Sequence, residues 1–325
     1  MKLKRIVSLV LALTLVFALA ALTSCQAKKT KYTIGICQLL PHPALDAATK
    51  GFMETLIAEF GEENITFYNE NAGNDIPVCT TIISNLVNKK VDLIMANATP
   101  ALTAAVNGTD SIPILGTSIT EYGTALGLDN FNGLVGGNVS GTSDLAPLDQ
   151  QAQMIIDLFP EAKTVAMLYA IGEANSKYQV KVVKEYLEAR NITVIDKAFT
   201  DSNDAATVAA AAAAEADVIY IPTDNTAAGC AQSIGNAVGD TPVIAGEEGI
   251  CSGCGVATLT IDYYDLGVAT AQMAIKILKG EANISEMPVA YAANFTKKYN
   301  AERCAELGID VEALKAAGYV AITND

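Results

Sequence analysis

The feature that most constrains this fold is a regular alternation of short apolar runs with longer amphipathic stretches, which begins at Tyr32. The apolar runs have the length of buried strands, and the stretches between them have the 3.6-residue periodicity of helices. Thr99 and Pro100 add the N-cap and first-turn signature of a further helix. The expected strands are 32–40, 65–69, 93–98 and 112–119, and the expected helices are 44–60, 76–88 and a stretch from Pro100. Strands that alternate with helices favour a parallel, doubly wound sheet.

The alternation is interrupted at 133–144 by the segment GLVGGNVSGTSD and then resumes. A segment rich in Gly, Ser, Thr and Asn is typical of a loop, so we predict a crossing between two domains there. The second series has expected strands at 164–169, 194–199, 217–222, 242–245 and 256–261, and expected helices at 149–158, 176–190, 204–216, 226–238 and 263–279. The sequence therefore predicts an α/β protein with two Rossmann-like lobes, each a doubly wound parallel sheet.

The first 25 residues have the pattern of an export signal. Lys2, Lys4 and Arg5 precede an uncharged apolar run, and this run ends at Leu22-Thr23-Ser24-Cys25, which matches the bacterial lipobox. We predict a signal peptide over 1–24, lipidation of Cys25 and a short polar tether over 25–31. The alternative is an uncleaved membrane anchor, and both readings place the rest of the chain outside the cytoplasm.

Composition removes several classes of function. The chain has 325 residues with 21 Lys+Arg against 36 Asp+Glu, a net charge of −15, which argues against nucleic-acid binding. Its one histidine, His42, argues against a multi-histidine metal centre and leaves a single possible base for a catalytic triad. Cys251 and Cys254 have C-x-x-C spacing without a second pair or a histidine partner, so we predict neither zinc nor any other metal or cofactor. The redox state of the cysteines is left open; besides Cys25 they are Cys37, Cys79, Cys230, Cys251, Cys254 and Cys304.

Small polar residues follow the expected strands in both halves of the chain, for example Ala98-Thr99, Thr117-Ser118, Thr223-Asp224 and Glu247-Glu248. Open α/β sheets bind ligands beyond the carboxyl ends of their strands. Two lobes that face each other would bring these polar ends into one cleft. A cleft of short side chains and backbone N–H groups suits the binding of a small polar molecule better than catalysis.

The motifs at these positions resemble the ABC transporter substrate-binding family that includes tryptophan and tyrosine importers. The resemblance covers nearly all of 32–308, and its motifs are PHPALD at 41–46, ATPA at 98–101, EANS at 173–176, PTDNT at 222–226, GEEG at 246–249 and IDYYDLG at 261–267. It implies a type I periplasmic-binding-protein fold whose lobes close around a ligand about a hinge of three crossings. We expect these crossings near 139–143, 262–263 and 289–292, with lobe 1 formed by 32–141 plus 263–290 and lobe 2 by 142–262 plus 291–325.

The resemblance also implies a lipid-anchored, extracytoplasmic binding protein that delivers an amino acid to a membrane permease. The chain lacks the GxxxxGK[ST] motif, so the ATPase would be a separate subunit. We expect a monomer with no catalytic residue, no cofactor and no nucleic-acid partner.

An α-amino acid needs N–H and hydroxyl donors for its carboxylate and an acidic group for its ammonium. For the carboxylate we predict Thr99 at a helix N-terminus, Thr117 and Ser118 after the next strand, and Asn175 and Ser176 from the second lobe. The alternative for Thr99 and Ser176 is a role as helix caps only.

For the ammonium we predict Asp224, with Asn225 beside it and Glu247 as second choice; the alternative for Asp224 is a helix N-cap. Asp262 is expected to act in the hinge. For the ligand side chain we predict Leu39 and His42, with Tyr122 and Tyr169 as weaker candidates for the wall. Family members tend to have Asp-Pro where this chain reads Thr120-Glu121-Tyr122-Gly123, a departure that leaves side-chain specificity open.

Other functions remain compatible with the sequence. The same fold can bind a nucleoside, a branched-chain amino acid or a sugar, although sugar sites commonly stack on tryptophan, and this chain has none. A sensor domain of a receptor and a thiol-dependent enzyme that uses Cys251 or Cys254 with His42 are the further alternatives.

Overall fold

The computed structural model describes residues 31–323. The predicted signal peptide 1–24, the lipidation site Cys25 and the tether up to residue 30 lie outside the described residues. Within 31–323, no helix has the length and apolar character needed to cross a membrane.

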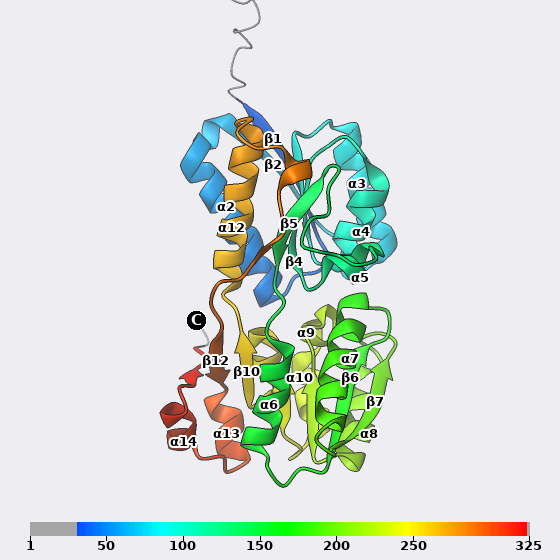
Figure 1. Cartoon of the computed structure of the whole chain (residues 1–325), viewed down its shortest axis with the longest axis vertical. Coiled ribbons are helices and arrows are strands. Elements are labelled where there is room, and N and C mark those ends of the chain that lie inside the picture. The colour runs from blue at the N-terminus through cyan, green and yellow to red at the C-terminus, as the bar shows by residue number, and fades with distance from the viewer. Residues whose placement is uncertain (1–30, 324–325) are drawn as a thin grey trace, which may run out of the picture.

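The molecule consists of two α/β lobes stacked along its long axis (Figure 1). The first lobe contains a six-stranded sheet in the order β11-β5-β4-β3-β1-β2, and its neighbouring strands are parallel. Its strands are β1 (Tyr32–Gln38), β2 (Ile65–Asn71), β3 (Leu93–Asn97), β4 (Ile114–Ile119), β5 (Val139–Ser143) and β11 (Ala290–Tyr291). Its helices are α2 (Pro43–Phe60), α3 (Ile76–Asn88), α4 (Thr99–Gly108), α5 (Tyr122–Leu126) and α12 (Tyr263–Leu278), with short 3-10 turns at Glu62–Asn64 and Ile284–Glu286.

The sheet of this lobe is buried on both faces. Phe52 and Leu56 of α2 and Ala271 of α12 pack against Ile34 and Leu93 on one face. On the other face, α3 and α4 pack against the alternate residues of the same strands. Burial on both faces explains why these strands read as nearly continuous apolar runs in the sequence.

The second lobe contains a seven-stranded sheet in the order β13-β12-β10-β9-β8-β6-β7, parallel except for β12, which runs antiparallel to β10. Its strands are β6 (Thr164–Ala170), β7 (Thr193–Phe199), β8 (Val218–Ile221), β9 (Val243–Ala245), β10 (Ala257–Thr260), β12 (Thr296–Tyr299) and β13 (Val320–Ala321). Its helices are α6 (Leu148–Leu158), α7 (Ala174–Glu188), α8 (Ala205–Glu215), α9 (Asn225–Gly229), α10 (Ala231–Val238), α11 (Glu248–Cys254), α13 (Ala301–Glu306) and α14 (Val311–Ala316). Residues of α6, α7, α13 and α14 cover one face, and residues of α8 to α11 cover the other.

The described chain passes between the lobes three times: between β5 and α6, between β10 and α12, and between β11 and β12. Strand β5 pairs with both β4 and β11 up to Ser143, so the predicted boundary between 141 and 142 falls inside a strand of the first sheet. The third crossing likewise begins after Tyr291, which pairs with Ser143. The small polar residues of β5 look like a linker in sequence. In the structure they are buried, and Thr142 has a hydrogen-bond partner in Thr270 of α12.

Three further differences from the sequence prediction concern local structure. The expected helix 226–238 is divided into α9 and α10 at Cys230, whose φ of −128° is not helical. The C-x-x-C segment lies in α11, a helix that the sequence did not predict. The strands β11 to β13 and the helices α5, α13 and α14 are too short to show a periodicity, and the sequence did not predict them.

Candidate functional site

The carboxyl-end loops of the two sheets meet at the junction between the lobes (Figure 1). His42, which follows β1, lies 3.4 Å through Nε2 from Oδ1 of Asn225, which follows β8. Asn74, which follows β2, donates through Nδ2 to the hydroxyl of Thr226 at 3.2 Å. The structure therefore brings together the ends of strands that are far apart in sequence.

A small cavity of about 10 Å³ lies at this junction. Its free volume is close to that of a single water molecule, so the lobes nearly touch across it. The residues that line it are His42, Leu45, Asp144, Thr223, Asp224, Asn225, Ala228, Glu247 and Tyr263. A wider groove of about 1030 Å³ shares Ala228, Glu247 and Tyr263 with the cavity and continues along α10 and α11. Among the predicted contacts, the cavity thus brings together His42, Asp224, Asn225 and Glu247.

Asp224 is buried and its carboxylate is held by three donors. Oδ2 accepts from the Ala170 N–H and from the Ser176 hydroxyl, both at 2.7 Å, and Oδ1 accepts from the Ala227 N–H at 2.8 Å. The last bond is the N-cap of α9 that the sequence analysis named as the alternative role of this residue. Burial raises the pKa of Asp224 to about 8, with the nearby Glu173 as the second cause.

Glu173 organises the second lobe's side of the junction, and the sequence analysis gave it no role. Its Oε1 accepts from the N–H and the hydroxyl of Thr226, and its Oε2 accepts from the N–H and the side-chain amide of Asn225 and from Asn175 Nδ2, all between 2.8 and 3.0 Å. This buried carboxylate therefore ties the start of α7 to the loop after β8. The only sequence signal was its place before a helix in the EANS motif, which does not show a partner fifty residues away.

Glu247 and Asp144 are the other two carboxyl groups of the cavity. Glu247 caps α11 by accepting from the N–H groups of Gly249 and Ile250, and burial raises its pKa to about 7. Asp144 follows β5 directly, and its Oδ2 accepts from the Tyr263 hydroxyl at 3.0 Å. Its Oδ1 is buried without a hydrogen-bond partner, and burial raises its pKa to about 6. The sequence does not predict a role for Asp144, because the polar segment 133–144 has the pattern of a linker.

His42 is buried at the opposite wall of the cavity, before the first turn of α2. Its Nδ1 has no hydrogen-bond partner, and burial lowers the pKa of its imidazole. Leu39, predicted beside it, is completely buried in the core of the first lobe and does not line the cavity.

The remaining predicted residues of the first lobe lie at the ends of β3 and β4. Thr99 begins α4, whose N-cap residue Ala98 has no side chain that could cap it. Ser118 has a buried hydroxyl without a partner, and both Ala98 and Ser118 have positive φ angles, 86° and 54°. Such strained backbone is uncommon outside glycine and collects at functional sites. Thr117 hydrogen-bonds Thr142 and Thr270 behind the sheet end. None of Thr99, Thr117 and Ser118 lines the cavity.

Asn175 and Ser176 lie behind the cavity wall and not on it. Ser176 donates to Asp224, while Asn175 donates to Glu173 and to the Thr223 carbonyl. Asp262 caps α12 by accepting from the Asp265 N–H next to the second crossing. Neither Tyr122, which is buried under β5, nor Tyr169 borders the cavity. At the departure from the family pattern, Glu121 caps α5.

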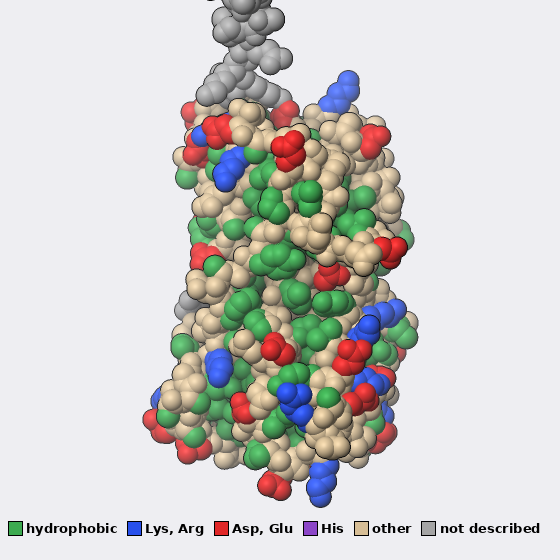
Figure 2. All heavy atoms as spheres, in the orientation of Figure 1, with side chains coloured by type: hydrophobic (Ala, Val, Ile, Leu, Met, Phe, Trp, Pro, Cys, Tyr) green, Lys and Arg blue, Asp and Glu red, His purple; other side chains and the backbone are tan. Residues whose placement is uncertain are grey.

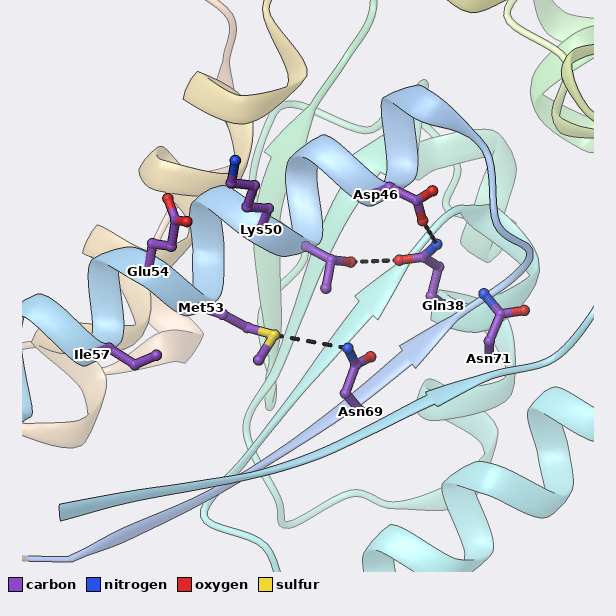
Figure 3. Close-up of a pocket in the computed structure, with 9 residues that line it drawn as sticks. Gln38, Asp46, Lys50, Met53, Glu54, Ile57, Asn69 and Asn71 are labelled. Atoms are coloured by element: carbon purple, nitrogen blue, oxygen red, sulfur yellow. Dashed lines mark hydrogen bonds between the residues drawn. The ribbon is translucent and has the colours of Figure 1, made fainter. Parts of the chain in front are cut away.

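A second pocket of about 480 Å³ lies entirely within the first lobe, between α2 and the edge strand β2 (Figure 3). Gln38 spans it by donating to Asp46 Oδ1 and accepting from the Thr49 hydroxyl. Among the described residues, no buried side-chain atom without a hydrogen-bond partner belongs to the lining of this pocket, whereas the junction cavity has two residues with such atoms. We therefore take the junction as the candidate site.

On the face of the molecule shown in Figure 2, hydrophobic side chains gather along the middle. Among the described residues, no group of three His, Cys, Asp or Glu side chains is arranged to hold a metal ion. Cys251 and Cys254 are buried in the second lobe's core, where burial raises the pKa of both thiols, while His42 lies at the junction.

Comparison with known proteins decides the family. The model of the ABC transporter substrate binding protein family matches residues 33–319. This chain belongs to that family. It is 35% identical over 306 residues to a tyrosine-binding protein of Clostridioides difficile, with 89% of this chain and 88% of the relative covered. The family consists of substrate-binding proteins without catalytic activity, so the thiol-enzyme alternative is excluded.

Two solved structures of similar proteins bear on the conformation. The complex of a Streptococcus pneumoniae protein with L-Trp is 32% identical and matches with a TM-score of 0.84, covering 90% of this chain and all of that one. The ligand-free, open structure of a Clostridium difficile substrate-binding protein with adhesive properties is 36% identical and has the same coverage, yet its TM-score is 0.68. The overall arrangement is thus closer to the tryptophan complex than to the open protein, in agreement with the narrow cavity. The predicted type I periplasmic-binding-protein fold is confirmed.

Proposed function

We propose that this ABC importer binding protein takes an aromatic amino acid, tyrosine or tryptophan, between its lobes. The main support is the junction cavity, two of whose lining residues have a buried polar atom without a hydrogen-bond partner: His42 at Nδ1, from the first lobe, and Asp144 at Oδ1, at the first crossing. Unpaired buried polar atoms are costly and rare in folded proteins, so a polar ligand is their natural partner. The names of the relatives, one tyrosine-binding and one in complex with L-Trp, supply the class of ligand.

The carboxylate of the ligand would be held by the first lobe. Helix α4 directs its uncapped N-terminus toward the carboxyl end of the sheet, beside Thr99 and the unpartnered Ser118 hydroxyl. The partial positive charge of a helix N-terminus and its free N–H groups favour an anion. The predicted roles of Thr99 and Ser118 are therefore retained in the proposal.

The second lobe would supply the other wall, with Asn225, Asp224 and Glu247 at the cavity and Asn175 and Ser176 fixing their positions. On the opposite side, the ligand's ring would lie against His42 and Leu45, with room for it in the adjoining groove. The groove's volume of about 1030 Å³ lies just above the usual range for small-molecule sites, so it can accept a ligand of this size.

The location of the protein in the cell is inferred from its family and from the export-signal pattern of its first 25 residues. As a binding protein of an importer, the chain works outside the cytoplasm with a permease. We propose that Cys25 carries the lipid anchor, that residues 25–31 tether the folded body to the membrane, and that a monomer engages the permease and its separate ATPase subunit.

Calorimetric titration of the protein with each of the amino acids, after removal of any co-purified ligand, tests the function. We expect tyrosine or tryptophan to bind with a dissociation constant in the micromolar range or below, about −8 kcal/mol or stronger. If no amino acid binds at micromolar concentration, the proposal is wrong. If leucine or valine binds more tightly than both aromatic amino acids, its aromatic part is wrong.

A further inference from the structure

The cavity contains three carboxyl groups, and none of its lining residues is Lys or Arg. The two oxygens of Asp224 accept three hydrogen bonds, and each oxygen of Glu247 accepts one from a backbone N–H. Both carboxylates are therefore engaged in holding the second lobe together. Asp144 differs, because its Oδ1 has no partner although the residue is only 4% exposed.

The position of Asp144 makes this difference informative. It directly follows β5 at the first crossing, and its N–H donates to the Ile119 carbonyl at 3.2 Å. Its Oδ2 accepts from Tyr263, the first residue of α12 after the second crossing. These bonds fix the carboxylate between two crossings, with Oδ1 left for a group that enters the cavity.

We propose that Asp144 is the residue that accepts the ammonium group of the ligand, the role that the sequence assigned to Asp224. A charged N–H donor in a water-poor cavity forms a strong hydrogen bond with a carboxylate and satisfies its unpaired oxygen. The inference rests on the proposed function, because it requires a ligand that carries an amino group. It makes Asp144 a specificity-determining residue that selects amino acids over the corresponding acids without an amino group.

The test compares two ligands on two proteins. L-Tyrosine and 3-(4-hydroxyphenyl)propanoate, which lacks only the amino group, are titrated into the native protein and the D144N variant, with weak binding measured by competition up to millimolar concentration. We expect D144N to weaken tyrosine binding about 10- to 100-fold. The affinity for the des-amino acid is expected to change less than about threefold, since that ligand has no group for Asp144 to accept.

Matched variants separate this role from a general effect of charge. Asp149→Asn removes an exposed carboxylate after the same crossing and should leave both affinities unchanged. Glu247→Gln removes a carboxylate of the cavity that already has two donors. An equal loss for both ligands in D144N, no loss for tyrosine, or a larger tyrosine-selective loss in E247Q each overturns the proposal.

The proposed function can fail separately. If tryptophan is the preferred amino acid, the same comparison is made with tryptophan and 3-(indol-3-yl)propanoate. If the native protein binds no amino acid at all, the proposed function is wrong and the assignment of Asp144 with it. If the native protein binds an amino acid and D144N binds it equally well, only the assignment of Asp144 is wrong.

Discussion

At the scale of single residues, the buried carboxyl groups of the junction set a cost of folding that depends on pH. Burial raises the pKa of Asp144 to about 6, of Glu247 to about 7 and of Asp224 to about 8, compared with ordinary values of 3.8 to 4.5. At these three groups the folded protein therefore binds protons more tightly than the unfolded chain, whereas the lowered pKa of His42 acts in the opposite direction. Stability from these groups is lowest above pH 8 and increases as the pH falls toward 4.

We predict that the free energy of unfolding of the ligand-free protein rises when the pH is lowered from 8 to 5. In D144N the rise in the free energy of unfolding should be smaller. The neutral asparagine does not pay the cost of burying a charged carboxylate, which reaches up to about 3 kcal/mol for Asp144 at pH 8. The side chains that act on Asp144 are Thr120 and Tyr263, which lower its pKa, together with Tyr122 and Glu247. The same comparison in E247Q shows the share of Glu247. Urea unfolding at pH 8, 6.5 and 5 measures the effect. Stability that falls toward pH 5, or an unchanged slope in D144N, would contradict the prediction.

The stability of D144N also shows whether a loss of tyrosine binding in this variant comes from misfolding. D144N is expected to be at least as stable as the native protein at pH 8 and yet to bind tyrosine more weakly. Opposite signs for stability and affinity are expected of a group kept for ligand binding at the expense of stability. A loss of binding caused by misfolding would instead lower both quantities together.

At the scale of elements, the closest packing in the first lobe joins α2 to α12, the helix that follows the second crossing. A Cβ atom at Gly267 would lie 2.0 Å from the Ala48 carbonyl oxygen, and one at Gly51 would lie 2.2 Å from the Tyr264 carbonyl oxygen. The two glycines therefore allow the backbones to approach and fix where α12 begins. Tyr263, which holds Asp144, lies at that beginning.

We predict that Gly267→Ala destabilises the protein by about 2 kcal/mol, because the helices must move apart to admit the methyl group. By helix propensity alone, the same change would stabilise α12 by about 1 kcal/mol, so the sign separates packing from propensity. Gly172→Ala is the control, since a Cβ there would have no atom within 4 Å. Denaturant unfolding of both variants checks this, and equal stability of Gly267→Ala and the native protein would show that the helices are not closely packed.

At the scale of the whole molecule, the described conformation is held by contacts that cross the junction. The Asn74–Thr226 hydrogen bond joins the loop after β2 to the loop after β8, so it breaks when the lobes separate. A ligand that contacts both lobes shifts the population toward the closed state, and any contact that stabilises this state raises the apparent affinity.

We predict that Asn74→Gly weakens ligand binding about two- to fivefold, the effect of one lost, partly buried hydrogen bond. Glycine keeps the positive φ of 66° that Asn74 adopts. Asn191→Gly is the matched control, because this exposed asparagine has a φ of 64° and lies away from the junction, after α7. Calorimetry gives the affinities, and small-angle scattering with and without ligand reports closure. Equal affinities in Asn74→Gly and Asn191→Gly would show that this contact does not contribute to closure.

The sequence by itself determined the class of fold and predicted the end of each sheet where the candidate site lies. Buried parallel strands and amphipathic helices have local periodicities, and polar residues at strand ends mark the edge where ligands bind. Only the tertiary structure decided which of those polar groups have an atom without a hydrogen-bond partner. Asp224 and Asp144 are both aspartates next to strands, yet one is saturated by Ala170, Ser176 and Ala227, and the other has an unpaired oxygen. Partners that lie fifty to more than a hundred residues apart leave no local pattern, because hydrogen bonds across a fold depend on how its elements pack.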